Sequence, residues 1–171
     1  TRFFNNISLK LFNKSYAYEH SVLLAYSYSR LIKKKLQEEL FDVIFAPVAS
    51  TELAFLPKQI PIIYTADATF SLISNYYPDY FSGQLRISIE EGNYIEQSAI
   101  NNSDLLIYPS NWAANSAMDH YGADKSKIKI IPYGANIDQT PPRDMILGKG
   151  KSDRCRLLFL GVDWERKGGE I

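Results

Sequence analysis

Residues 104–122 read DLLIYPSNWAANSAMDHYG, and this stretch decides the fold class. It opens with a short apolar run, typical of a buried strand, which Pro109 ends. Ser110 is a good N-cap for a helix that runs to about Tyr121, and Gly122 supplies the C-terminal stop. A buried strand followed at once by a helix is the repeating unit of a parallel α/β sheet.

The same alternation recurs on both sides of this stretch. Apolar residues in steps of three and four predict a helix over residues 18–40, and Gly92 interrupts a second helical pattern, where close packing is the simplest explanation. Further strands are predicted at residues 41–46, 60–65 and 127–131, with helices over 51–56 and 84–101. We therefore predict an α/β fold, a Rossmann-like parallel sheet with helices on both faces.

The composition changes after the fourth predicted strand. Residues 135–153 hold two prolines and two glycines among polar residues, which is typical of a linker. The apolar run at residues 154–160 then predicts the first strand of a second domain. Because the chain begins without methionine and stops as this pattern opens, we expect both ends to be internal to a longer protein.

Charge and cysteine content narrow the class of protein. Nineteen basic residues balance nineteen acidic ones, so no nucleic-acid partner is expected. The single cysteine, Cys155, excludes an internal disulfide framework and a multi-thiolate metal site, and suits a reducing cytoplasm. No apolar run approaches the ~20 residues that cross a bilayer, and the first residues lack a signal-peptide pattern, so a soluble protein is expected.

Parallel sheets bind ligands in crevices outside the carboxyl ends of their strands. In this chain the rule selects five loops, at residues 47–51, 66–70, 109–112, 132–136 and 162–168.

Three of these loops carry a resemblance to a known family. Residues 108–113 (YPSNWA) and 131–138 (IPYGANID) resemble the end of the N-terminal domain in family-four retaining glycosyltransferases. Residues 157–168 (LLFLGVDWERKG) are similar to the opening strand and loop of the C-terminal domain, which binds the donor. Each motif alone is weak, and the resemblance rests on their order and spacing.

The resemblance implies a GT-B enzyme that transfers a sugar from a nucleotide-diphosphate sugar to a glycan, lipid or small-molecule acceptor with retention of configuration. No cofactor and no metal are expected. It assigns residues 1–137 to the later part of the N-terminal, acceptor-side domain, 138–153 to the interdomain linker and 154–171 to the truncated start of the donor-binding domain. Such a piece is expected to be inactive alone and to act in the cytoplasm, with association to the inner face of the cell membrane left open, as is the oligomeric state.

The resemblance also places candidate residues that would hold the donor. Lys167 takes the family's lysine position, six residues after Gly161, and would neutralise the diphosphate leaving group. Val162 stands where the family usually has arginine, and Arg166 either supplies that charge or is a surface residue. Asp67 stands at or near the family's histidine position, where it would contact the sugar as the catalytic residue or cap a turn.

Three further residues are candidates for contacts in the cleft: Ser110, Gly134 and Asn136. The N-cap role already explains Ser110, and hinge geometry competes with ligand contact for Asn136.

Two alternatives to the transferase stay open. One is a non-catalytic binding domain of the same fold, which the replacements at Val162 and Asp67 favour, and the other is a sugar-nucleotide epimerase.

Overall fold

The computed structural model describes residues 2–148, 154, 157–165 and 167–170. It divides into two compact units, Thr1–Tyr133 and Gly134–Ile171, which are described separately. The division falls close to the predicted start of the linker, and the assignment of the two units to separate domains stays a prediction.

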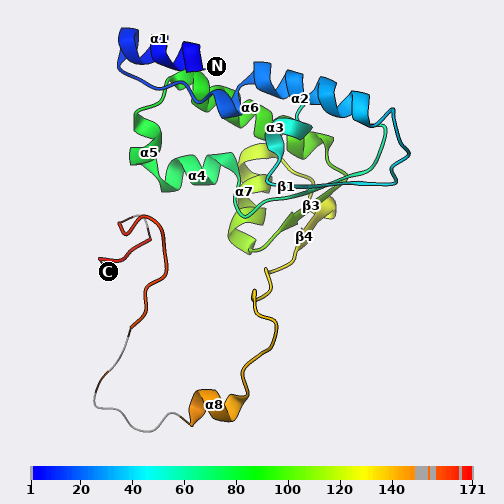
Figure 1. The fold of residues 1–171 in the computed structure, drawn as a ribbon. Coiled ribbons are helices and arrows are strands. Elements are labelled where there is room, and N and C mark those ends of the chain that lie inside the picture. Colours follow the sequence, from blue (N-terminus) through cyan, green and yellow to red (C-terminus); the bar gives the residue numbers. More distant parts are fainter. Residues whose placement is uncertain (1, 149–153, 155–156, 166, 171) are drawn as a thin grey trace. The chain divides into compact units, whose positions relative to one another are not determined.

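The first unit holds a four-stranded parallel sheet in the order β1-β2-β3-β4 (Figure 1). Its strands are β1 (Ile44–Pro47), β2 (Ile62–Thr65), β3 (Leu105–Tyr108) and β4 (Ile128–Ile130). β2, β3 and β4 lie within predicted strands, whereas β1 runs one residue past the predicted 41–46 and includes Pro47, and all three pairings are parallel. The predicted α/β, Rossmann-like sheet is therefore confirmed.

Seven α-helices accompany this sheet in the described part of the first unit. They are α1 (Arg2–Phe12), α2 (Val22–Lys35), α3 (Ser50–Leu53), α4 (Phe70–Tyr76), α5 (Pro78–Ser82), α6 (Arg86–Asn102) and α7 (Asn111–Tyr121), with 3-10 turns at Tyr18–His20 and Lys125–Lys127. The helix predicted over residues 18–40 is shorter than expected. It begins after Ser21, because the side chain of this residue caps it by accepting a hydrogen bond from the Leu24 N–H at 3.3 Å.

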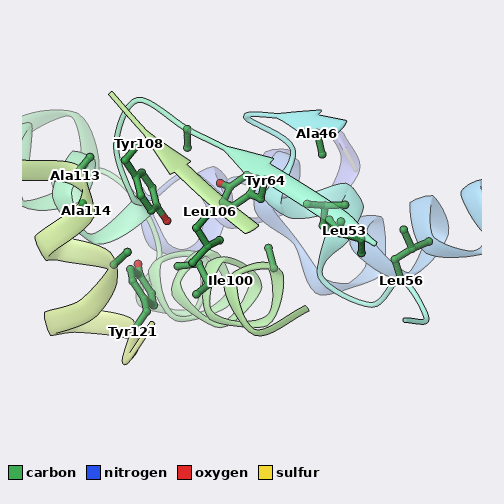
Figure 2. Packing of buried hydrophobic residues seen from close by; sticks show 14 residues of the cluster. Ala46, Leu53, Leu56, Tyr64, Ile100, Leu106, Tyr108, Ala113, Ala114 and Tyr121 are labelled. Carbon is green, nitrogen blue, oxygen red and sulfur yellow. The ribbon is translucent and has the colours of Figure 1, made fainter. Parts of the chain in front are cut away.

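The core lies between one face of the sheet and the helices. Ile62, Tyr64 and Leu106 point from the strands into a buried cluster with Ile100 of α6 (Figure 2). Strand order 1-2-3-4 with right-handed crossovers puts every connecting helix on the same side. We predicted helices on both faces of the sheet, and the described residues form the helix layer on this one face. On the opposite face of β1, Phe45 is 62% exposed.

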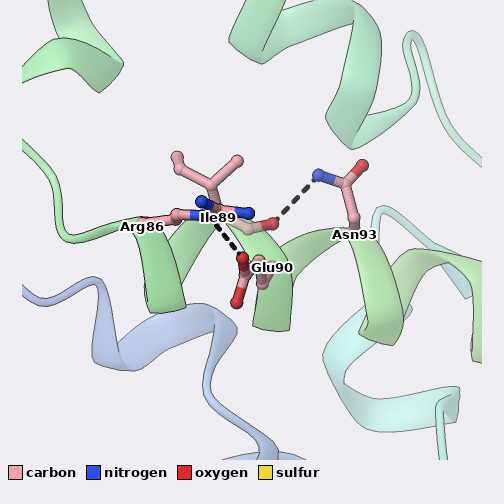
Figure 3. A network of polar contacts seen from close by, with 4 residues as sticks. All are labelled: Arg86, Ile89, Glu90 and Asn93. Carbon is pink, nitrogen blue, oxygen red and sulfur yellow. Dashed lines mark hydrogen bonds and ion pairs between the residues drawn. The ribbon is translucent and has the colours of Figure 1, made fainter.

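Helix α6 is the central helix of this layer and contacts α2, α3, α4 and α7. Gly92 in its middle is buried against Phe70, which confirms that close packing explains the glycine. On its exposed side the Arg86 Nε lies 2.7 Å from Glu90 Oε1, and Asn93 donates to the Ile89 carbonyl at 2.9 Å (Figure 3). This surface ion pair contributes little stability.

Helix α7 has both predicted ends. The Ser110 side chain accepts a hydrogen bond from the Ala113 N–H at 3.3 Å, and Gly122 has the left-handed conformation, with φ of 62°. The Gly122 N–H donates to the Met118 carbonyl at 3.0 Å, which is the 5→1 bond of an αL cap, and the Ala123 N–H donates to the Ala117 carbonyl at 3.0 Å.

The second unit contains the short helix α8 (Arg143–Leu147), which lies within the predicted linker. The strand predicted at residues 154–160 is not formed at the positions that the structure describes, 154 and 157–160. A strand needs a neighbouring ladder to bond its backbone, and the described residues of this unit offer none. Leu157, accordingly, is 92% exposed.

Candidate functional site

The carboxyl ends of the four strands form one continuous edge. Hydrogen bonds extend the alignment just past the strand ends. They run from the Val48 N–H to the Thr65 carbonyl at 2.8 Å, from Ala66 to Ile107 at 3.3 Å and from Ile131 to Tyr108 at 2.9 Å. The loops after β1, β2 and β3 therefore leave the sheet side by side, as the ligand-binding rule for parallel sheets requires.

Asp67 lies on this edge, two residues after the end of β2, and its side chain is exposed. The helix that follows is capped by another residue, because the Thr69 side chain accepts from the Leu72 N–H at 3.3 Å. Thr69 Oγ1 also lies 2.7 Å from Ser116 Oγ, which joins this loop to α7. Asp67 thus stands on a loop that is anchored on both sides, with its carboxylate directed to solvent.

Ser110 lies on the same edge, at the start of the loop after β3. It is half-buried and serves as the N-cap of α7. Since β2 and β3 are neighbours in the sheet, the structure brings Asp67 and Ser110 to adjacent loops.

The remaining candidates belong to the second unit. Gly161 and Lys167 lie together there, because a Cβ built on Gly161 would be 3.3 Å from Lys167 Cγ. The Lys167 N–H donates to the Asp163 carbonyl at 3.1 Å, which bends the chain back toward Gly161 and leaves the side chain exposed. Gly134 and Asn136 are exposed near the start of the unit. Arg166 lies outside the described residues.

Sequence reasoning gave no functional role to Glu96, the most deeply buried carboxylate of the first unit. It is 3% exposed on α6, and the Tyr64 hydroxyl donates to its two oxygens at 3.2 and 3.3 Å. Burial raises the pKa of Glu96 to about 7, although hydrogen bonds from Ser50 and Tyr64 lower it. The feature of the sequence that could have pointed to Glu96 is the position of an acidic residue between Gly92 and Ala99, within the apolar stripe of the helix.

An apolar pocket of about 400 Å³ opens between α1, α2 and the start of α6. Phe4, Ile7, Phe12, Leu24 and Leu85 are among its lining residues. Helices α2 and α6 lead into the amino ends of strands, so their first turns lie toward the carboxyl edge. The pocket therefore opens toward the same end of the sheet as Asp67.

The serines and Tyr16 on the pocket wall are already bonded to the protein. The Tyr16 hydroxyl donates to Glu91 Oε2 at 2.5 Å, and the Ser27 hydroxyl donates to the Leu23 carbonyl at 2.9 Å. Burial and Glu91 raise the pKa of Tyr16 to about 12. These walls consequently favour an apolar ligand group.

The described residues contain no group of three or more His, Cys, Asp or Glu side chains placed to hold a metal ion. Over the same part of the chain, every helix is too short or too polar to cross a bilayer.

The parallel sheet with polar residues on its carboxyl edge defines the chain as a ligand-binding domain of the Rossmann-like class. The family model described as Glycosyltransferase Family 4 matches residues 9–139, well over half of the 171 residues. The chain therefore belongs to this family, and the protein is a glycosyltransferase. Comparison with curated proteins gives no match.

Proposed function

We propose that the protein transfers a sugar from a nucleotide-diphosphate donor to an acceptor with retention of anomeric configuration. Lys167 would neutralise the departing diphosphate, helped by Arg166 and by the close approach that Gly161 allows. The observation that carries this proposal is the pairing of Gly161 with Lys167, which exposes an ammonium group on a tight turn. A mobile cation at this point suits a leaving group on which negative charge develops.

Asp67 would contact the donor sugar. Its exposed carboxylate can accept hydrogen bonds from sugar hydroxyls or balance positive charge at the sugar carbon. Ser110, Gly134 and Asn136 would add further contacts to the ligand. We assign no cofactor and no metal to this reaction, and we place it in the cytoplasm or at the inner face of the cell membrane.

The acceptor would bind to the first unit and would be a carbohydrate or a lipid-linked molecule. The apolar pocket favours an acceptor that carries a hydrocarbon or aromatic group, because its lining is apolar and its serines and Tyr16 already have partners.

A non-catalytic binding protein is the second candidate function. Val162 in place of the family's arginine favours it, since the donor site then has one cation fewer. The epimerase alternative has less support, because the two histidines are engaged within the first unit. His20 packs edge-on against Phe70, and His120 shares a hydrogen bond with Ser116.

The test uses the full-length protein that contains this chain, incubated with UDP-, GDP- and ADP-linked sugars and a panel of glycan and lipid acceptors. We expect acceptor-dependent release of a nucleoside diphosphate and a product whose anomeric configuration, read by NMR, matches the donor's. A product of opposite configuration would contradict retention. Saturable donor binding without transfer would instead support the non-catalytic candidate.

A further inference from the structure

The Glu96 carboxylate is buried without a cationic partner among the described residues. Its two oxygens accept from the Tyr64 hydroxyl at 3.2 and 3.3 Å. The ion pair that the structure describes on this helix joins Arg86 to Glu90, at the surface. A buried acid that is held by a hydroxyl group is costly, so its placement calls for a reason beyond stability.

The hydroxyl partner belongs to a strand that ends at the carboxyl edge. Tyr64 precedes the last residue of β2, and Asp67 follows that strand by two positions. The bond therefore ties α6 to the strand from which the Asp67 loop leaves.

The loop after β1 also carries backbone strain. Val48 has a φ of 51°, which a β-branched residue rarely adopts, and it is 70% exposed. Such strain persists only where surrounding contacts hold it, and it gathers at functional sites. The Val48 N–H donates to the Thr65 carbonyl at 2.8 Å, which joins this turn to the residue that follows Tyr64 on β2.

We propose that Glu96 is a positioning residue for the site: by holding the Tyr64 hydroxyl, it fixes the end of β2, and with it the loop that carries Asp67 and the strained turn at Val48. It acts through Tyr64 and does not itself touch the substrate. The inference rests on the proposed function for its catalytic readout, and on the fold alone for its structural readout.

Three tyrosines face Glu96 from the elements packed around it. They are Tyr64 on β2, Tyr108 on β3 and Tyr121 on α7, and Figure 2 shows all three in the core. The Tyr108 hydroxyl is buried without a hydrogen-bond partner among the described residues. Burial raises the pKa of each tyrosine well above its usual range, so Glu96 is the group of this cluster that exchanges a proton near neutral pH.

The structural test is amide hydrogen exchange on the full-length protein. In Glu96→Leu the amides of Val48 and Ala66 should exchange about tenfold faster, because the loops lose their shared anchor. The Ala114 amide at the start of α7 should keep its wild-type rate. Should Glu96→Leu fail to fold, Tyr64→Phe, which removes the same hydrogen bonds, should accelerate both amides. Unchanged exchange at Val48 in the folded variants would overturn the proposal.

The catalytic test compares Glu96→Gln with Glu96→Leu and with the matched control Glu90→Gln, at the surface of the same helix. The leucine variant should lose about tenfold or more in kcat with little change in donor KM, and the glutamine variant should recover most of it and flatten the pH profile between about 6 and 8. Equal activity of both Glu96 variants would contradict a positioning role. Absence of transfer in the wild type would reject the proposed function and leave the exchange test decisive.

Discussion

The Phe70 ring occupies the space that a side chain at position 92 would need, since a Cβ built on Gly92 would lie 2.2 Å from Phe70 Cζ. The ring is itself held edge-on by His20 and Phe81, with centroids 5.3 and 5.7 Å away. Because Phe70 begins α4, directly after the Asp67 loop, this contact sets how closely that loop approaches α6.

Gly92→Ala should destabilise the protein, although alanine is the better helix former. The propensity gain is at most about 1 kcal/mol. Forcing a methyl group into the ring costs about 1–3 kcal/mol, because Phe70 cannot move freely. Urea unfolding should therefore show a lower free energy of unfolding.

Gly83→Ala is the matched control, since a Cβ at Gly83 would meet nothing within 4 Å. It should be neutral or slightly stabilising. Combining Gly92→Ala with Phe70→Leu should cost less than the sum of the two single changes, because the smaller side chain leaves room for the methyl group. Strict additivity would mean that the two residues do not compete for space.

Stability should fall as the pH rises through the neutral range. Burial raises the pKa of Glu96 from an ordinary value of 4.5 to about 7, so between these values the folded protein holds a proton that the unfolded chain releases. The free energy of unfolding therefore decreases from about pH 4.5 to 7 and levels off above it. Glu96→Gln should remove this part of the slope, gaining at most a few kcal/mol over wild type by pH 8.

Tyr64→Phe should extend the pH-dependent loss of stability to higher pH. It removes a hydrogen bond that favours the charged carboxylate, so the pKa of Glu96 should rise further and stability should be lost over a higher pH range. Parallel stability–pH curves for wild type, Glu96→Gln and Tyr64→Phe would show that Glu96 does not titrate in this range.

Substitutions of Ser110 separate its two proposed roles. Ser110→Ala should lower stability by about 1 kcal/mol through loss of the α7 cap, whereas Ser110→Asp should keep the cap. Ser98→Ala, which removes a mid-helix bond to Tyr94, is the control and should have a smaller effect. If Ser110 also contacts a ligand, Ser110→Asp should bind the donor or acceptor less well at unchanged stability. Equal activity of this variant and wild type would show that Ser110 caps α7 and does not contact a ligand.

Filling the apolar pocket tests the nature of the acceptor. Leu24→Trp should raise KM for acceptors with a hydrocarbon or aromatic group while leaving donor KM unchanged, because the pocket lies within the first unit. Leu31→Trp, at an exposed position on the same helix, is the control. An unchanged acceptor KM in Leu24→Trp would separate the pocket from the acceptor site.

The sequence predicted the four strands of the sheet well because each is a short apolar run bounded by proline, glycine or polar residues. It also located the α7 cap and the close contact at Gly92, since these depend on local chemistry. The helices α4 and α5 escaped prediction because residues 70–82 are rich in aromatic residues without a clear helical period. α4 packs against α6 and α7, and α5 packs against α4, and a local pattern does not contain these contacts.

The site was predictable only as a set of loops. Parallel topology alone places Asp67 and Ser110 on one edge, and this followed from the order of strands and helices. The hydrogen bonds of Glu96 to Tyr64 join residues far apart in the chain, so no spacing could reveal them. The strand expected at residues 154–160 failed for a related reason, because apolar residues form a strand only where a partner ladder is present.

The most direct measurement is titration of the full-length protein with a nucleoside diphosphate, for wild type, Lys167→Ala and the surface control Lys125→Ala. If Lys167 compensates the diphosphate, its removal should weaken binding about tenfold or more, as expected for a lost charge-assisted contact, and should lower sugar transfer further. The control should match wild type. Unchanged affinity and unchanged transfer in Lys167→Ala would contradict the account, since the proposed donor site would then lack its cation.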